Sequence, residues 1–395
     1  MEKEKYPRIR FKGFTDAWEQ RKLSELVLIE RGGSPRPIDD YITDAPDGLN
    51  WVKIGDAPTQ GHYITKTAEK IKPEGLSKTR QVQPGDLILS NSMSFGKPYI
   101  MAINGCIHDG WLLIRDTNNI FDLTFLCHLL GTTQMLGQYK QFAAGSTVNN
   151  LNKELVGNTI VTIPSKPEQK VLGEYFESMD SLITLHQRKL IFLKSHRFQM
   201  SVLFCYSWEQ RKYADIGSNS SGGNLSYDSL ADNGKFKCVL YGDLYTLYDC
   251  TISSIERKTN FRGNSIKYND ILFPQSTTVD AYSLISPACL NEKNAETSGV
   301  FVISPNFDID GNFIAYYTKG NEKQRIKLSK KAQGLTIVHL YYQSIKDETI
   351  FVPSFNEQKK ISKLLISFDK LITLHQRKCE KLKNIKTSLL EKMFV

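Results

Sequence analysis

The sequence predicts a mixed α+β protein in which two tandem domains of similar fold are separated and linked by two long antiparallel helices. Residues 182–189 and 371–378 both read LITLHQRK, so the chain contains an internal repeat. Each copy lies within a heptad pattern typical of a long helix, and each half contains short apolar runs typical of strands. The expected parts are a first domain at 1–163, a first helix at 164–204, a second domain at 205–352 and a second helix at 353–395.

The duplication extends beyond the eight identical residues. Residues 18–22 and 208–212 both read WEQRK, and the pattern PSxxEQK occurs at 164–170 and again at 353–359. All these copies are separated by 189 or 190 residues, which is too regular for coincidence. Between them the halves resemble each other only in outline, as in GDLI against NDIL. We therefore expect two domains that share one fold and differ in their surfaces.

Short apolar runs that follow turn-forming residues predict strands in each domain. Residues 85–89 and 270–273 suit buried strands. Residues 159–163 and 349–352 are rich in β-branched side chains and suit strands that close each domain. A proline follows each closing strand, and this is where a long helix is expected to begin.

The two helices are predicted to form an antiparallel coiled coil with pseudo-two-fold symmetry. Each has about 35 residues and would span roughly 50 Å. Ser165 and Ser354 are N-cap candidates, with Glu168 and Glu357 at capping-box spacing. One such helix alone could be an ordinary buried helix, but two copies matched in length and phase favour a helix pair. The expected interface residues are Leu172, Phe176, Met179, Ile183, His186, Leu190, Leu193, Ile361, Leu365, Phe368, Ile372, His375, Leu382 and Leu389, with Arg197, Met200, Cys379 and Lys386 at the remaining seam positions.

Composition limits the class of protein and of partner. The 395 residues carry a formal net charge of +9, which favours a polyanionic partner such as nucleic acid. The seven cysteines are scattered and form no C-x-x-C pair, so they suit a reducing cytoplasm and predict no structural zinc site. The first residues lack the apolar core of a secretory signal, and no apolar run is long enough to span a membrane. We expect a cytoplasmic protein without membrane contact.

No catalytic motif is recognisable in the sequence. There is no glycine-rich nucleotide-binding loop and no N/D-P-P-Y/F motif of an amino-methyltransferase. The E-Q-K triplets at 168–170 and 357–359 match the end of a nuclease motif, but they lie in the first turn of a long helix, where a capping glutamate explains them. No aspartate at a strand end pairs convincingly with them, so the structural interpretation is favoured. The five histidines outside the helix seam have no spacing that suggests a metal site. The expectation is therefore a protein with no catalytic residue, no metal and no bound cofactor.

Polar loops in the two diverged domains are the candidate nucleic-acid contacts. Arginine can pair with guanine and asparagine with adenine, while serine, threonine and lysine can hold phosphates. The alternative for any single residue is ordinary solvated surface. The candidates are Arg31, Arg36, Asn91, Ser92, Lys97, Ser146, Thr147, Asn149 and Asn150 in the first domain, and Arg257, Lys258, Arg262, Gln275, Ser276, Thr277 and Thr278 in the second.

The order of these motifs, repeated twice, resembles the specificity subunits of type I restriction-modification systems. The resemblance rests on four motifs: WEQRK near the start of each half, GDLILS from Gly85, the loop Ser146-Thr147-x-x-Asn150, and the P-x-x-x-E-Q pattern at the start of each long helix. The resemblance implies two target-recognition domains, each reading one half of an asymmetric bipartite site in double-stranded DNA. It also implies that the helices bind two methyltransferase subunits, through which restriction-translocase subunits attach. S-adenosylmethionine, ATP and Mg²⁺ would then belong to those partners.

The second domain departs from the first in its loops, because PQSTT at 274–278 stands where SNSMSFGK stands at 90–97. This puts in doubt any residue-for-residue transfer of DNA contacts between the halves. Two other functions stay open at this point. A stand-alone nuclease or methyltransferase would act on DNA without partners, whereas a protein-binding coiled-coil scaffold would show no sequence-specific footprint.

Overall fold

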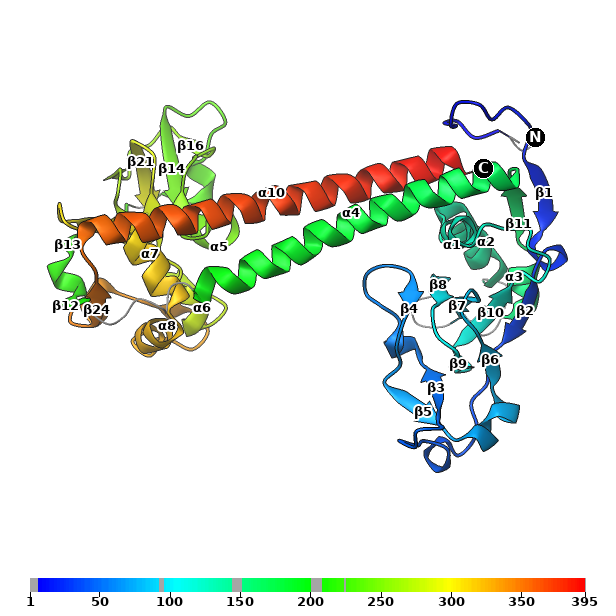
Figure 1. The fold of residues 1–395 in the computed structure, drawn as a ribbon. Coiled ribbons are helices and arrows are strands. Elements are labelled where there is room, and N and C mark those ends of the chain that lie inside the picture. The colour runs from blue at the N-terminus through cyan, green and yellow to red at the C-terminus, as the bar shows by residue number, and fades with distance from the viewer. Residues whose placement is uncertain (1–5, 92–95, 144–150, 200–207, 224, 395) are drawn as a thin grey trace. The chain divides into compact units, whose positions relative to one another are not determined.

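The computed structural model describes residues 6–91, 96–143, 151–199, 208–223 and 225–394 (Figure 1). The chain divides into two compact units. Unit 1 comprises Met1–Arg188 with Gln376–Val395, and unit 2 comprises Lys189–His375. Each unit therefore contains one domain and part of both long helices. The boundaries predicted from the sequence separate the domains from the helices and therefore divide the chain differently. They stay a prediction.

Within its described residues, unit 1 contains two larger sheets and a strand pair. In neighbour order, the five-stranded sheet is β2 (Leu28–Arg31), β10 (Trp111–Arg115), β7 (Leu87–Ser90), β8 (Pro98–Met101) and β4 (Tyr63–Ile64). The four-stranded sheet is β5 (Glu69–Ile71), β3 (Leu49–Val52), β9 (Gly105–Ile107) and β6 (Arg80–Val82), and the pair is β1 (Glu19–Lys22) with β11 (Ile160–Ile163). The helices are α1 (Leu123–Leu130), α2 (Thr133–Ala143) and α3 (Lys153–Gly157), with 3-10 turns η1 (Leu23–Glu25), η2 (Ile38–Asp40), η3 (Ile54–Asp56) and η4 (Pro73–Lys78).

Over the part of its chain that the structure describes, unit 2 repeats the two larger sheets and the strand pair of unit 1 and has one further strand pair. Its five-stranded sheet is β13 (Gly217–Ser221), β22 (Val300–Pro305), β18 (Ile271–Pro274), β20 (Ala288–Leu290) and β15 (Thr251–Ile252). Its four-stranded sheet is β16 (Lys258–Thr259), β14 (Phe236–Leu240), β21 (Asn294–Ser298) and β17 (Asn264–Lys267), and its pairs are β12 (Glu209–Lys212) with β24 (Thr349–Val352) and β19 (Ser276–Thr277) with β23 (Val338–His339). The helices are α5 (Asp243–Thr246), α6 (Ala281–Leu284), α7 (Gly311–Gly320), α8 (Glu322–Ser329) and α9 (Tyr342–Ile345), with η5 (Tyr213–Asp215) and η6 (Tyr227–Ser229). The matching strand order confirms the prediction of two domains with one mixed fold.

The turn before the central strand of each large sheet explains the residues found there. Gly85 has φ 94° and Asn269 has φ 76°, a left-handed conformation that favours glycine and tolerates asparagine. The aspartate that follows each of them accepts a hydrogen bond from a backbone N–H three residues earlier, at 2.8 Å for Asp86 and 2.7 Å for Asp270. Each strand then runs into the core with all four residues buried. The strands predicted at these positions are confirmed.

The WEQRK repeat is a strand that pairs with the closing strand of its own domain. Glu19 faces Ile163 in the antiparallel register of β1 and β11, and Glu209 faces Val352 in the same register of β12 and β24. The tryptophan before each strand is buried. The two ends of each domain are therefore joined at the point where its long helix begins.

The long helices are α4 (Lys166–Gln199) and α10 (Phe355–Met393), and they run antiparallel. In unit 1, Lys386 Nζ lies 2.6 Å from Asp180 Oδ1, and Cys379 Sγ lies 3.9 Å from the Ile183 carbonyl. In unit 2, Arg197 Nε lies 2.9 Å from Asp369 Oδ1. The described seam side chains are buried or half-buried, whereas the leucines and isoleucines beside them, such as those at 182, 185, 191 and 371, are exposed.

The start of each helix is held by the glutamine of the repeated E-Q pair. Gln169 Oε1 accepts a hydrogen bond from the Asp122 N–H at 2.9 Å, and its amide donates to the Pro164 carbonyl at 3.1 Å. Gln358 makes the matching bonds to Asp310 and Pro353, at 2.9 Å each. The expected capping role of the glutamate is wrong for α4, because the Glu168 carboxylate accepts two hydrogen bonds from Arg10 at 2.7 Å.

The largest apolar core of unit 1 includes the end of the chain. Met393 and Phe394 are 3% exposed and pack with Trp18, Phe125 and Phe176. The sequence pattern assigned 353–395 only to a spacer helix, so this contribution to the first domain is new. Among the described residues, no helix is both long and apolar enough to cross a membrane.

Candidate functional site

The predicted contact residues of unit 1 gather around Asp109, which the sequence pattern did not single out. Ser34 Oγ donates to Asp109 Oδ1 at 3.1 Å, and Arg36 Nη2 lies 3.6 Å from Oδ2. Arg31 Nε and Asn91 Nδ2 donate to the Asp109 carbonyl at 3.4 and 2.9 Å. These bonds tie the loop after β2 to the turn between β9 and β10. The loop presents Arg31 and Arg36 to solvent, where both can meet a phosphate or a base edge.

Asn91, described above, and a further unit 1 candidate, Lys97, are not freely exposed. Asn91 is 2% exposed, so a direct contact through its amide would require this loop to open. Lys97 is half-buried, with its ammonium 5.0 Å from the centre of the Tyr99 ring. The other candidates, Ser92, Ser146, Thr147, Asn149 and Asn150, lie outside the described residues.

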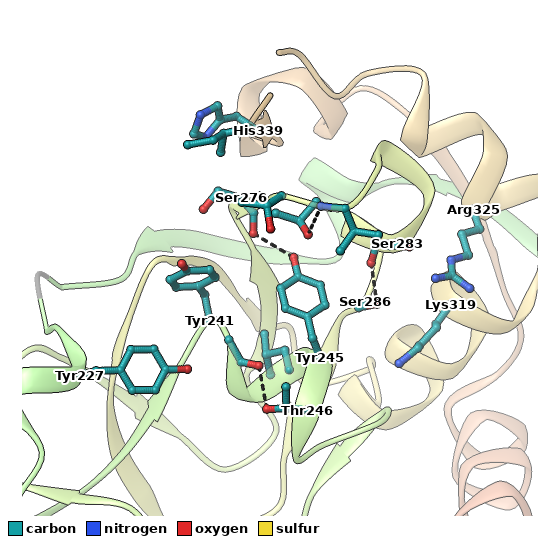
Figure 2. Close-up of a pocket in the computed structure, with 16 residues that line it drawn as sticks. Tyr227, Tyr241, Tyr245, Thr246, Ser276, Ser283, Ser286, Lys319, Arg325 and His339 are labelled. Atoms are coloured by element: carbon teal, nitrogen blue, oxygen red, sulfur yellow. Dashed lines mark hydrogen bonds between the residues drawn. The ribbon is translucent and has the colours of Figure 1, made fainter. Parts of the chain in front are cut away.

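In unit 2 three predicted residues line one pocket of about 690 Å³. These residues are Ser276, Thr277 and Thr278, and they come from β19 and the turn after it. The rest of the wall comes from η6, α5, α6, α7, α8 and β23. Figure 2 shows Tyr227 and Tyr241 to the left of the pocket and Lys319 and Arg325 to the right. The pocket therefore collects hydroxyl groups, aromatic rings and cations in one hollow.

The chemistry of this pocket suits a polyanion. Its described lining contains Lys319, Arg325 and His339 and no acidic side chain. Lys319 is already paired with Asp249 Oδ1 at 2.7 Å. The Arg325 guanidinium lies 4.0 Å from the centre of the Tyr282 ring, and its Nε donates to the Tyr282 carbonyl at 3.1 Å. These two contacts fix its direction, and its terminal N–H groups suit an anion. Such a site can bind a phosphate through the cations and a base edge through the hydroxyls.

The hydroxyl groups of this pocket differ in exposure. Thr278 is exposed, Ser276 is half-buried, and Thr277 is 7% exposed. Tyr245 Oη donates to the Ser276 carbonyl at 3.0 Å, which holds the strand edge in place. Thr278 is therefore the predicted residue best placed for direct contact. The buried Thr277 would need the turn to move.

The other unit 2 candidates lie outside this pocket. Arg257 Nε is 2.9 Å from the buried carboxylate of Asp243, so this arginine holds the domain together. Lys258 and Arg262 are exposed, and the Arg262 guanidinium lies 5.0 Å from the centre of the Phe236 ring. Gln275 is half-buried, and its backbone bonds to Gly299 and Leu340. Sequence reasoning missed the pocket tyrosines and Arg325 because they come from elements far apart in the chain.

A polar cluster joins α4 to the first domain in unit 1. His62 Nε2 lies 3.0 Å from Asp180 Oδ2, and His128 Nε2 lies 3.8 Å from the same oxygen. Burial lowers the pKa of His128 to about 3, with help from the charges of Lys386 and His62, so its ring is neutral at neutral pH. Burial raises the pKa of Asp180, but His62 and Lys386 outweigh it and lower that pKa to about 2. The cluster is thus a carboxylate held between an ammonium and two imidazoles.

Unit 2 builds its cluster at the same place from other side chains. Arg197 bonds Asp249 Oδ2 at 2.5 Å as well as Asp369, and Tyr316 Oη donates to Asp369 Oδ2 at 2.5 Å. Burial raises the pKa of Tyr316, and the Asp369 charge raises it further, so the hydroxyl keeps its proton. Every charge in this cluster has a partner of the opposite sign.

The model of the type I restriction modification DNA specificity domain matches residues 15–195 and again 206–384. Two proteins of Methanocaldococcus jannaschii are similar over most of their length. One is named as the type I restriction enzyme MjaX specificity subunit (24% identical, 94% of this chain, 92% of the relative), and the other as the MjaVIII specificity subunit (20% identical, 91% and 93%).

Solved structures show the same fold. A type I restriction-modification S subunit from M. genitalium matches with a TM-score of 0.59 and 17% identity, over 99% of both chains. A chain from a study of complex assembly and conformational transition of the type I R-M system matches with a TM-score of 0.55 and 14% identity, over 96% of this chain and 98% of that one. Two copies of the specificity domain thus cover most of the sequence, and the chain belongs to the family of type I restriction-modification DNA specificity subunits, which recognise a DNA target and are not themselves catalytic.

Proposed function

We propose that this chain reads an asymmetric bipartite site in double-stranded DNA, with one half-site for each domain. The observation that carries this proposal is a shared strand order combined with different loops. The strand β7 leads into SNSMSFGK in the first domain, and its counterpart β18 leads into PQSTT in the second. Two readers with one scaffold and different contact chemistry suit two different half-sites.

Within the second domain, the pocket lined by residues 276–278 is the proposed contact with DNA. Thr278 offers an exposed hydroxyl that can donate to or accept from a base edge. Arg325 offers a guanidinium suited to a phosphate. In the first domain, Arg31 and Arg36 at the Asp109 loop would have the corresponding role, because both are exposed at one edge of the five-stranded sheet.

The long helices are proposed to bind two methyltransferase subunits, through which the restriction-translocase subunits attach. Leu182 and Leu185 on α4 are 47% and 46% exposed, and their copies Leu371 and Leu374 on α10 are 44% and 45% exposed. Exposed leucines repeated with the same neighbours suit two copies of one partner. S-adenosylmethionine, ATP and Mg²⁺ would act on those subunits, in the cytoplasm.

The test is a map of methylated bases in cells that carry the full system with pocket variants. Thr278→Ala should relax one half of the methylated motif and leave the other half unchanged, because a lost base contact costs about 1–3 kcal/mol at one position. Thr117→Ala, at an exposed threonine in the turn after β10, is the matched control and should leave both halves intact. Arg325→Ala should weaken binding to all sequences and reduce its salt dependence, as expected for a phosphate contact.

The unchanged half-site serves as an internal control for assembly. If the Thr278 variant altered both halves or neither, the assignment of this pocket would be wrong. Normal methylation of the wild-type motif together with no DNA footprint from this chain would instead favour the protein-binding scaffold.

A further inference from the structure

The two polar clusters at the helix–domain junctions differ in one informative way. His128 in α1 and Tyr316 in α7 each stand six residues after the N-cap aspartate of their helix, so they occupy equivalent positions. Tyr316 closes its cluster with a hydrogen bond to Asp369. His128 makes no equivalent hydrogen bond, because its buried Nε2 has no hydrogen-bond partner among the described residues. A buried polar atom left in this way is costly unless something else binds it.

The open nitrogen of His128 faces two further ligand atoms. One atom each from His62, His128 and Asp180 lie within 4.8 Å of one another. A tetrahedral zinc ion with bonds of about 2.0–2.1 Å places its ligand atoms roughly 3.3 Å apart. The two distances to Asp180 Oδ2, 3.0 Å from His62 and 3.8 Å from His128, lie on either side of that value. The two imidazole nitrogens lie at most 4.8 Å apart, so rotation of the rings that brings them to the zinc spacing would complete the site.

The donor set decides which class of ion fits. Two imidazole nitrogens and one carboxylate suit zinc and neighbouring transition metals, whereas magnesium and calcium prefer oxygen ligands alone. Glu177 stands one helical turn before Asp180 and is half-buried, close enough to interact electrostatically with His62. It can serve as a fourth ligand, or a water molecule can take that position.

Lys386 is the natural competitor for this site. Its ammonium lies 2.6 Å from both oxygens of Asp180 and supplies the positive charge that a metal would bring. A metal bound to Asp180 Oδ2 would repel this ammonium, which could move toward the Glu177 carboxylate. The Asp180 carboxylate can therefore be neutralised in two ways, by the ammonium or by the metal.

We propose that unit 1 binds one divalent transition metal of the zinc class through His62, His128 and Asp180, and that this ion fastens α4 to the first domain. Unit 2 has no such site at the matching position, because a tyrosine occupies the place of His128 and an arginine bonds the carboxylate. The sequence predicted no zinc site from its cysteine spacing and no metal site from its histidine spacing. The histidines of this site are distant in sequence and meet only in the fold.

The probe is Co²⁺, titrated into the metal-free full-length chain and followed by visible absorption. One Co²⁺ per chain should bind with the absorption of a low-coordinate site, and Zn²⁺ should displace it. His128→Tyr reproduces the side chain of the other half, so the fold should tolerate it, and we expect cobalt affinity to fall at least about 100-fold. His196→Tyr, at a half-buried histidine outside the cluster, is the matched control and should leave the affinity unchanged.

A second variant keeps the test sharp if His128→Tyr fails to fold. Lys386→Met removes the competing ammonium and should tighten cobalt binding several-fold. The proposal is overturned if the wild-type chain shows no such absorption, if His128→Tyr binds cobalt as tightly as wild type, or if Lys386→Met weakens binding. None of these readouts involves DNA, so failure here leaves the proposed function untouched.

Discussion

The last described residue of the chain gives a direct test of how the first domain is stabilised. Phe394 is 3% exposed and stacks on Phe125, with ring centres 5.4 Å apart and an angle of 19°. It also contacts Phe176 at 5.6 Å and meets the edge of Trp18 at 6.4 Å. The end of the second helix is therefore part of the core of the first domain. Phe394→Ala should destabilise unit 1 and leave unit 2 intact.

The expected size follows from the packing. Removing a buried phenylalanine side chain costs about 3–5 kcal/mol. For a unit of this size, each kcal/mol shifts the melting temperature by about 2–4 °C, which gives a fall of roughly 6–20 °C. Phe307 is 95% exposed, so Phe307→Ala is the matched control and should change stability by less than about 0.5 kcal/mol.

Hydrogen exchange measured by mass spectrometry can separate the two units within the intact chain. In Phe394→Ala, peptides that cover 18–26 and 121–130 should lose protection, while peptides that cover 300–305 should keep it. Loss of protection in unit 2 alone, or a melting temperature equal to that of wild type, would refute the idea that the C-terminus completes the first domain.

Three further predictions concern the helix seam, acid stability and the duplication. Ile183→Asp should abolish assembly with the methyltransferase subunits and lower the melting temperature, because burying an unpaired carboxylate costs several kcal/mol. Leu185→Asp is the control and should leave the melting temperature unchanged. Normal assembly of Ile183→Asp together with a changed DNA motif would show that the roles given to helices and domains are reversed. Two lysine partners lower the pKa of Glu348, so its stabilising effect on unit 2 is complete above the usual carboxyl pKa of 4.5 and is lost as pH falls below that value. In Glu348→Gln the stability of unit 2 should therefore depend less on pH in this range. An unchanged pH profile would contradict this. The fragment 207–395 should dimerise through α10 and, with methyltransferase subunits, methylate an inverted repeat of one half-site; recovery of the asymmetric motif would disprove the two-reader model.

Repetition made the fold predictable from the sequence. A single heptad stretch is ambiguous, but two copies at one spacing define two helices, and the segments between them must then be the domains. The strands at 85–89 and 349–352 were predictable because turn residues and β-branched runs are local signals. Local signals also gave one wrong prediction, the capping role of Glu168. The Glu168 carboxylate instead bonds Arg10, which is distant in sequence but close in space.

The candidate sites were predictable only as loops. Asn91 belongs to a polar loop by composition, yet its amide is used inside the domain, and no sequence pattern reports burial at that level. The pocket beside Thr278 depends on tyrosines from separate elements, and the metal site depends on His62 and His128, which lie on different elements. The place of Phe394 in the first core was also not predictable, because Phe394 lies far in sequence from the residues that it contacts. Contacts between distant segments are fixed by tertiary packing, which a single sequence without an alignment does not reveal.

The duplication also shows which positions are free to vary. Asp180 and Asp369 are copies, and each bonds a cation on the facing long helix, Lys386 in one unit and Arg197 in the other. The helix side of each junction is therefore kept, while the domain side changes from His128 to Tyr316. The helices carry the near-identical parts of the repeat, whereas the domains have diverged between them. A recognition domain moved onto these helices must then bring its own hydrogen-bonding anchor for that aspartate. Without an anchor, the carboxylate keeps the cation on the facing helix but loses its domain-side partner, at a cost of about 1–3 kcal/mol.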